Sequence, residues 1–412
     1  MNRIKEKSFL EKMYFVLSAL FTGVFIFEIP GAVFYSPLLL FAAFLVYSIY
    51  SGRTINYSVS MLVLLIFTVS YVYFIYKPED SLYYQSYIHI QAVFMYIIGF
   101  NFLNDKSTEE RKKYAENYFL IISLFFIAYI LITFYHHFYQ TAADLSYRFY
   151  YSVWYSSVTK PSTVISMCLV FPLAYGLYSL FYLRWPYKIV GGVFCFITVY
   201  INVRTATRTL IFLFPFALTA EFIFWLIFEK KKKKIGFILL GICAAALIGI
   251  IVLFVLWKDS LAQTFAQYGF SRIFSPGRST QLRIKYIMNV INDFKLNYFG
   301  GGIHSLTCGT PHNIWLYIYD WGGIVSFGIF CVFTGFMIYN YIRFFFNHNY
   351  SVALKAFLST ALALIFVEFM MEPFILPLPS FYILCYFVFG LISGFSRKSA
   401  NAATAKISGE EQ

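Results

Sequence analysis

Residues 117–138, NYFLIISLFFIAYILITFYHHF, form the stretch that decides the fold. The stretch contains no Asp, Glu, Lys or Arg, and Arg111, Lys112 and Lys113 stand shortly before it. A helix needs about 20 consecutive, mostly apolar residues to cross a bilayer. Basic residues beside such a run favour the cytoplasmic side of the membrane. This stretch is therefore expected to span a membrane, with its N-terminal end inside the cell.

The composition of the whole chain matches this stretch. Among 412 residues, 60% are hydrophobic and only 12% are charged, whereas soluble domains average about 25% charged residues. A soluble chain this apolar would not have enough polar side chains to cover its own surface. We therefore expect an integral membrane protein, and we exclude a soluble enzyme, a porin and a nucleic-acid binder.

Eleven further apolar runs of similar length predict an all-α, polytopic membrane protein with about twelve spanning helices. The chain is expected to divide into helices one to nine (1–257), an outer loop carrying short helices (258–312), and helices ten to twelve with a cytoplasmic tail (313–412). The basic start of the chain resembles a signal peptide, but no A-x-A-like cleavage site follows, so it is interpreted as a retained first helix. The twelve predicted spans are 11–29, 31–50, 55–76, 86–103, 117–138, 161–183, 188–203, 209–228, 235–257, 313–341, 355–373 and 378–396.

The positions of the basic residues predict the orientation. When the N-terminus is placed inside, most of the 32 Lys and Arg residues fall in cytoplasmic loops or at the two termini. The predicted topology is therefore N-in and C-in. The net charge of +13 then follows from membrane orientation. The run of lysines at 230–234 is interpreted as a cytoplasmic anchor, and binding to anionic lipid is an additional role that the run allows.

Several classes of site are absent from the sequence. The six Cys residues are scattered without a CxxC pair, which predicts neither a disulfide framework nor a zinc site. No GxxxxGK[ST] loop is present, so the chain is not expected to hydrolyse ATP itself. The predicted outer side carries no Asp-rich motif. We therefore expect no cofactor and no metal ion, and any chemistry is expected on the outer face.

The first candidate site contains two arginines in NVRTATRTL, residues 202–210. Arg204 and Arg208 are four residues apart, so they share one face if this segment is helical. Arginine forms a planar fork that suits phosphate, and the amide groups at the start of the following helix also favour an anion. The alternative is that both side chains reach the membrane interface and only anchor the helix ends.

The second candidate site lies in the outer loop, where STQLRIKY (279–286) precedes FGGG (299–302). Arg278 and Arg283 make this segment basic, which suggests a contact with phosphate or sugar phosphate. The glycines permit a tight turn beside a ligand. A solvated helix in the loop, without a ligand, is the alternative.

The third candidate site is GTPHNIWLYIYDWGG, residues 309–323. His312 stands immediately before a predicted span, and Asn313 is placed to orient it. A neutral imidazole can accept a proton near neutral pH, which makes His312 a candidate general base. A histidine at a helix boundary is otherwise a structural hydrogen-bonding residue.

Three segments carry a resemblance to a known family: TATRTLIFLF (205–214), LRIKYIMNVINDFKLNYFGGG (282–302) and PHNIWLYIYDWGGIVSFG (311–328). They resemble the superfamily of O-antigen polymerases (Wzy) and O-antigen ligases. In that family an arginine ends a middle helix, and a long outer loop ends in an H-N-x-x-L motif. Arg208 matches the family arginine best, and Arg204 duplicates it. Trp321 departs from the acidic or small residue that family members often carry before the glycine.

The resemblance implies transfer of a glycan from undecaprenyl diphosphate, with no metal and no cofactor, at the outer face of the bacterial inner membrane. His312 would act as the general base, and Arg208 and Arg283 would bind the diphosphate. Arg204, Arg278 and Asn313 would assist substrate binding. Tyr151 and Trp154 are further candidates for stacking on sugars. An aromatic belt at the membrane interface is the alternative role for these two residues.

Two reactions share this machinery. A polymerase joins carrier-linked repeat units of O-antigen or capsular polysaccharide, whereas a ligase transfers the finished glycan to lipid A-core. The Phe-, Tyr- and Ile-rich composition and the ending MMEPFILPLPSFYILCYFVFG (370–390) favour a polymerase. Its partners would be membrane lipid, the carrier-linked glycan, a chain-length regulator and a flippase, and no nucleic acid. A flippase or transporter is the alternative class, for which Glu221 and Glu368 are the main polar residues within spans.

Overall fold

The structure is a computed structural model, and it describes most of the predicted helices. The predicted span 235–257 lies outside the described residues, as does most of 209–228. The described residues are 2–75, 80–102, 107–141, 149–151, 154, 159–205, 214, 217–219, 221, 224, 278–292, 298–302, 312–371, 375 and 378–397.

The N-terminal part of the chain folds into five helices that match the first five predicted spans. Helices α1 and α5 extend beyond their predicted apolar runs, because each begins in a polar segment before the apolar one. The helices are α1 (Asn2–Ile26), α2 (Ala32–Tyr50), α3 (Val59–Ile75), α4 (Asp80–Asn101) and α5 (Thr108–Thr141).

The remaining described elements include two short strands that the all-α prediction did not contain. Strands β1 and β2 pair antiparallel, with Tyr150 opposite Lys160, between the predicted spans 117–138 and 161–183 and at the start of the second. The predicted span 161–183 corresponds to α6 and α7, which are separated only by a turn at Leu169 with helical φ and ψ and together form one candidate membrane span, Thr163–Tyr182. The elements are β1 (Phe149–Tyr151), β2 (Thr159–Pro161), α6 (Ser162–Cys168), α7 (Val170–Tyr182), α8 (Trp185–Thr205), α13 (Arg278–Asn292), α15 (Ile314–Phe345), α16 (Val352–Met371) and α17 (Pro379–Phe395).

The helices have the length and the surface of a membrane protein. Five helical segments in the described part of the chain are long and apolar enough to cross a bilayer, and three shorter helices are also strongly apolar. Large apolar side chains point outward from several helices; examples are Ile49, Val69 and Phe196, which are 75%, 62% and 69% exposed. Such side chains are stable against lipid and unfavourable against water. The protein is therefore membrane-embedded, while the count of twelve spans and the direction of insertion stay predictions.

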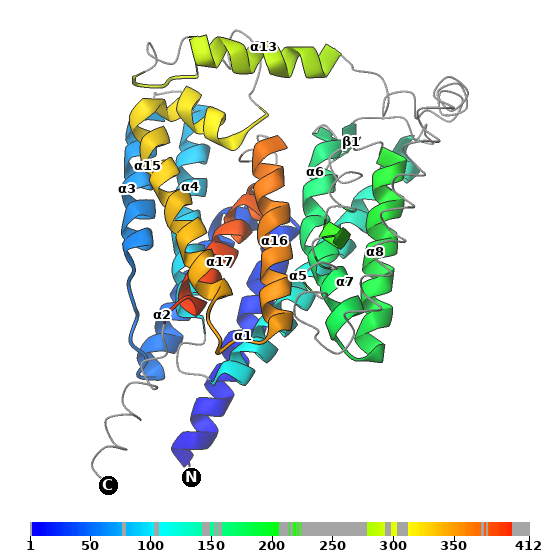
Figure 1. Ribbon diagram of the computed structural model, residues 1–412. Helices are drawn as coiled ribbons and strands as arrows, with labels where there is room; N and C mark the ends of the chain where they lie inside the picture. The colour runs from blue at the N-terminus through cyan, green and yellow to red at the C-terminus, as the bar shows by residue number, and fades with distance from the viewer. Residues whose placement is uncertain are drawn as a thin grey trace.

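The start of α1 lies at one end of the helical bundle, which we call the terminal end, and α13 lies across the opposite end (Figure 1). The turn between α7 and α8 and the turn between α15 and α16 are at the terminal end. The start of α15 and the strands β1 and β2 are at the α13 end. The segments predicted to be outer are thus gathered at one end of the molecule, which we call the α13 end.

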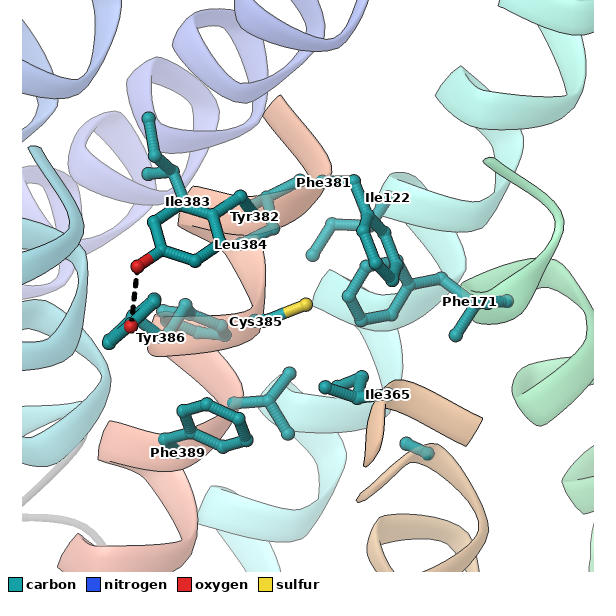
Figure 2. Close-up of a cluster of buried hydrophobic side chains, with 14 of the residues drawn as sticks. Ile122, Phe171, Ile365, Phe381, Tyr382, Ile383, Leu384, Cys385, Tyr386 and Phe389 are labelled. Carbon is teal, nitrogen blue, oxygen red and sulfur yellow. Dashed lines mark hydrogen bonds between the residues drawn. The ribbon is translucent and has the colours of Figure 1, made fainter. Parts of the chain in front are cut away.

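The C-terminal helix α17 forms the centre of the core. All of its residues are buried, so it is apolar around its whole circumference, as expected for a helix surrounded by other helices. Tyr382 and Tyr386 lie on one side of α17, while Cys385 points the opposite way, toward Phe171 of α7 (Figure 2).

Glycines set the close contact between α17 and α4. A Cβ atom added at Gly390 would lie 2.2 Å from the carbonyl oxygen of Tyr96, and one at Gly99 would lie 2.2 Å from that of Phe387. Gly394 follows Gly390 by one helical turn and approaches the carbonyl oxygen of Phe100 in the same way. Small residues four apart let membrane helices approach until their backbones touch, and dispersion then holds them together. We call this contact the α4–α17 seam.

Candidate functional site

The candidate residues His312 and Asn313 stand directly before the first turn of α15. The side chain of Asn313 caps the helix, since its Oδ1 accepts hydrogen bonds from the amides of Trp315 (3.0 Å) and Leu316 (3.1 Å). Asparagine is among the preferred N-cap residues because it satisfies amides that have no partner within the helix. His312, half-buried, directly precedes this cap. Asn313 thus caps α15 directly after His312, while the suggestion that it orients the His312 side chain stays a prediction.

The predicted span 313–341 is not one straight helix. Gly323 has φ 72° and ψ −177°, which breaks the helix and separates its first part from the rest. We call residues 314–322 the arm. A glycine with positive φ just after a helical segment is a common way for a helix to end. In Figure 1 the arm runs across the α13 end of the bundle before α15 turns down into it.

The glycine loop of the second motif closes onto this break. The amide of Gly301 donates to the carbonyl oxygen of Trp321 (3.1 Å), and the amide of Gly302 donates to that of Asp320 (2.9 Å). These carbonyl groups stand at the end of the arm, where the break removes their usual helical partners. We call this arrangement the glycine clasp. It joins two motifs that the sequence had suggested separately.

The clasp requires glycine for two reasons. Gly300 and Gly302 have φ angles of 73° and 69°, a region that other residues rarely adopt. A Cβ at Gly300 would lie 2.2 Å from the carbonyl oxygen of Trp321, and one at Gly302 would lie 2.8 Å from the Trp321 ring. The Trp321 ring, which departs from the family pattern, is therefore in direct contact with the clasp.

Helix α13, which carries the predicted Arg278 and Arg283, packs on the arm. Tyr286 and Val290 of α13 and Tyr319 of the arm form a small buried cluster. Arg283 precedes Tyr286 by three residues and Val290 by seven, and this helical spacing gives all three positions the same face of α13. The basic helix and the HN motif are thus adjacent because of an apolar contact.

The remaining arginines occupy a different part of the molecule or fall outside the described residues. Arg204 is near the C-terminal end of α8, which ends at Thr205. In Figure 1 α8 stands on the side of the bundle away from α3 and α15. Arg208 lies outside the described residues, as do the side chains of Arg204, Arg278 and Arg283. The structure therefore brings α13 and the HN motif together and does not bring α8 to the arm.

The two predicted sugar-stacking residues lie in or beside the β1–β2 pair. Tyr151 ends β1, and Trp154 follows it. The indole Nε1 of Trp154 donates to the carbonyl oxygen of Phe27, just after the end of α1, at 2.6 Å. The Trp154 side chain is 44% exposed. Trp154 thus tethers this segment to α1 through its nitrogen, while nearly half of its surface stays open to a ligand.

Sequence reasoning missed the residues that shape the arm. The signal was present in Asp320-Trp321-Gly322-Gly323, because glycine pairs at the end of a helical pattern indicate a helix stop. The continuous apolar run on both sides of the glycines concealed that stop. Tyr71 of α3, which packs against Gly322, had no sequence signal at all, since it is one of 36 tyrosines.

Comparison with known proteins adds no family to this picture. No protein-family model matches the chain, and no curated protein matches it in a sequence comparison. The class of the protein, a helical membrane protein, therefore follows from the chain itself.

Proposed function

We propose that the protein is a glycosyltransferase that polymerises undecaprenyl-diphosphate-linked oligosaccharide repeat units at the outer face of the bacterial inner membrane. The product would be O-antigen or capsular polysaccharide. The observation that carries the proposal is the packing of α13, with Arg278 and Arg283, on the arm that begins after His312 and Asn313. This contact places a basic helix on the arm that follows the candidate proton acceptor, at the end of the bundle away from the start of α1.

The proposed chemistry divides the work between two kinds of residue. A diphosphate leaving group develops negative charge, and preorganised arginines stabilise such charge. Arg283 and Arg208 are the proposed diphosphate ligands, with Arg204 and Arg278 assisting. His312 accepts the proton from the acceptor hydroxyl as that oxygen attacks the anomeric carbon and the bond to the diphosphate breaks. No metal ion enters the proposed mechanism.

A ligase that moves the finished glycan to lipid A-core is the second candidate, since the same residues would serve both reactions. The Phe- and Tyr-rich composition favours the polymerase. In a cell that makes repeat units, loss of a polymerase leaves single repeats on the carrier or on the core. Loss of a ligase leaves long chains on the carrier.

The transporter alternative depends on polar groups within the spans. The two glutamates named for this alternative, Glu221 and Glu368, are both buried, and each accepts a hydrogen bond from a neighbouring hydroxyl. Glu221 accepts from Thr360 at 2.8 Å, and Glu368 accepts from Ser166 at 3.3 Å. A buried carboxyl group that takes part in hydrogen bonds can hold helices together without transporting anything. These contacts therefore weaken the argument that Glu221 and Glu368 line a transport path.

His312→Ala provides the decisive test. A general base contributes about 10²- to 10⁴-fold to a rate, so the variant should insert and accumulate normally while forming almost no polymer. Glycan length and amount are measured on gels from cells in which the variant replaces the natural protein. Polymer of normal length and amount would show that His312 is only a helix-boundary residue.

The matched control is His348→Ala. His348 is exposed and lies in the turn between α15 and α16, at the terminal end of the bundle. Its loss should leave polymer unchanged, and an equal defect in both variants would point to folding and not to catalysis.

A further inference from the structure

A polar cluster inside the bundle lies directly behind the arm. His89 of α4 is only 1% exposed, and its Nδ1 is 3.1 Å from the hydroxyl of Tyr382 of α17. The Tyr382 hydroxyl is in turn 2.7 Å from that of Tyr386, the contact drawn as a dashed line in Figure 2. Buried polar groups of this kind stay in place because breaking their hydrogen bonds leaves polar atoms without partners in an apolar interior.

Tyr71 of α3 connects this cluster to the arm. Its ring is fully buried and lies 4.4 Å from the His89 ring, centroid to centroid. On its other side the ring fills the space left by the missing side chain of Gly322, where an added Cβ would lie 2.5 Å from Cδ2 of Tyr71. The Tyr71 ring is thus held between a hydrogen-bonded histidine and the last residue of the arm before the break.

Further contacts along α3 fix the helix below the break. The Ser70 and Ser326 hydroxyls are 3.3 Å apart, and the rings of Phe67 and Phe330 are 5.0 Å apart. Helix α3 therefore holds both sides of Gly323, the arm through Tyr71 and the descending helix through Ser70 and Phe67. Because both segments pack on α3, one angle between the arm and the descending part of α15 is favoured. A change of this angle would open a gap between α3 and one of the two segments.

We propose that Tyr71 is a positioning residue, which sets the direction of the arm and thereby the place of His312, with the His89–Tyr382–Tyr386 cluster as its support. The catalytic part of this inference rests on the proposed function. The structural part does not, because the direction of the arm can be measured without any substrate. Tyr71 acts through the arm and has no contact with the reacting atoms in this proposal.

Fluorine NMR on protein labelled with 5-fluorotryptophan tests the structural part. The chain contains six Trp, and Trp321 on the arm is assigned by its loss in Trp321→Phe. Tyr71→Leu removes the ring, so the Trp321 resonance should broaden or split as the arm adopts several directions. Tyr71→Phe keeps the ring and should disturb the resonance less than Tyr71→Leu does. Trp185, which is 73% exposed at the start of α8, serves as the internal control and should not change.

Two further variants keep the test decisive if Tyr71→Leu accumulates poorly. Gly322→Ala pushes on the Tyr71 ring from the other side and should also disturb the Trp321 resonance. Combining it with Tyr71→Leu should restore the resonance in part, because the added methyl group then enters the space that the ring has left. His89→Phe removes the hydrogen bond to Tyr382 and should disturb Trp321 less than Tyr71→Leu does.

Kinetics test the catalytic part. A misplaced catalytic group lowers turnover, and a displacement of about 1 Å can cost about 10²-fold. Tyr71→Leu should therefore reduce kcat about tenfold or more with little change in KM, whereas Tyr71→Phe, which keeps the ring, should lose less of kcat. An unchanged Trp321 resonance together with unchanged kcat in Tyr71→Leu would overturn the proposal. A disturbed resonance in a protein that forms no polymer even as wild type would support the positioning of the arm and refute the proposed function.

Discussion

The α4–α17 seam and the glycine clasp both depend on glycine, but for opposite reasons. At the seam, Gly99, Gly390 and Gly394 lie within helices, and the absence of a side chain lets two backbones touch. At the clasp, Gly300, Gly302 and Gly323 adopt positive φ angles, and the absence of a side chain lets the chain leave helical geometry. The seam therefore holds the core together, whereas the clasp shapes one end of a single helix.

The two regions also differ in what depends on them. The seam lies in the most extensively packed pair of helices, between residues that are almost all buried. The clasp lies at the α13 end, where Phe299 is 75% exposed, and it joins the loop after α13 to the arm. Substitutions at the seam should therefore prevent the protein from folding stably. Substitutions at the clasp should leave the protein folded but displace the candidate site.

The largest effect is expected from Gly390→Leu at the seam. Its Cβ would lie 2.2 Å from the carbonyl oxygen of Tyr96, so α17 must move away from α4. Overpacking of this kind costs typically about 1–3 kcal/mol and sometimes more. The variant should lose most of its monodisperse protein in size-exclusion chromatography and unfold at a lower temperature. Gly335→Leu on α15 is the matched control, because nothing lies within 4 Å of its added Cβ. Equal stability of the two variants would contradict the prediction that Gly390 is required for the close packing of α17 on α4.

An intermediate effect is expected from Gly302→Ala at the clasp. The new residue must adopt a φ near 69° and place its Cβ 2.8 Å from the Trp321 ring. The backbone strain alone costs about 1–3 kcal/mol. Gly52→Ala carries the same strain at a φ of 64°, with nothing within 4 Å. The unfolding temperature of both variants should therefore fall, and that of Gly302→Ala should fall further because of the contact with Trp321. Only Gly302→Ala should lose polymer formation. Equal activity in both would show that the clasp does not serve the site.

The smallest effect on stability is expected from Asn313→Ala. It removes a helix cap that accepts two amide hydrogen bonds, and loss of an N-cap costs about 1 kcal/mol. The melting temperature should fall slightly, and polymer formation should fall because the start of the arm frays beside His312. Asn313→Asp keeps the cap acceptor and should restore both properties. If Asn313→Asp proves as inactive as Asn313→Ala, then the amide group itself contacts substrate and capping is not its main role.

Hydrophobic pattern was a reliable guide to the helices and a poor guide to their interruptions. The predicted 31–50 corresponds to Ala32–Tyr50, and 378–396 corresponds to Pro379–Phe395. The break at Gly323 was missed, because apolar residues continue across it. The β1–β2 pair was missed as well, since three-residue strands leave no periodic pattern in a loop.

The sequence by itself determined that this protein is helical and membrane-embedded, because length and hydrophobicity are properties of each segment alone. It also determined that His312 stands immediately before a helix. Only the tertiary structure decided that the glycine loop closes on Trp321, that α13 packs on the arm, and that Tyr71 lies against Gly322. These contacts join residues far apart in the chain. They depend on the shapes that the helices leave between them, which no local pattern encodes.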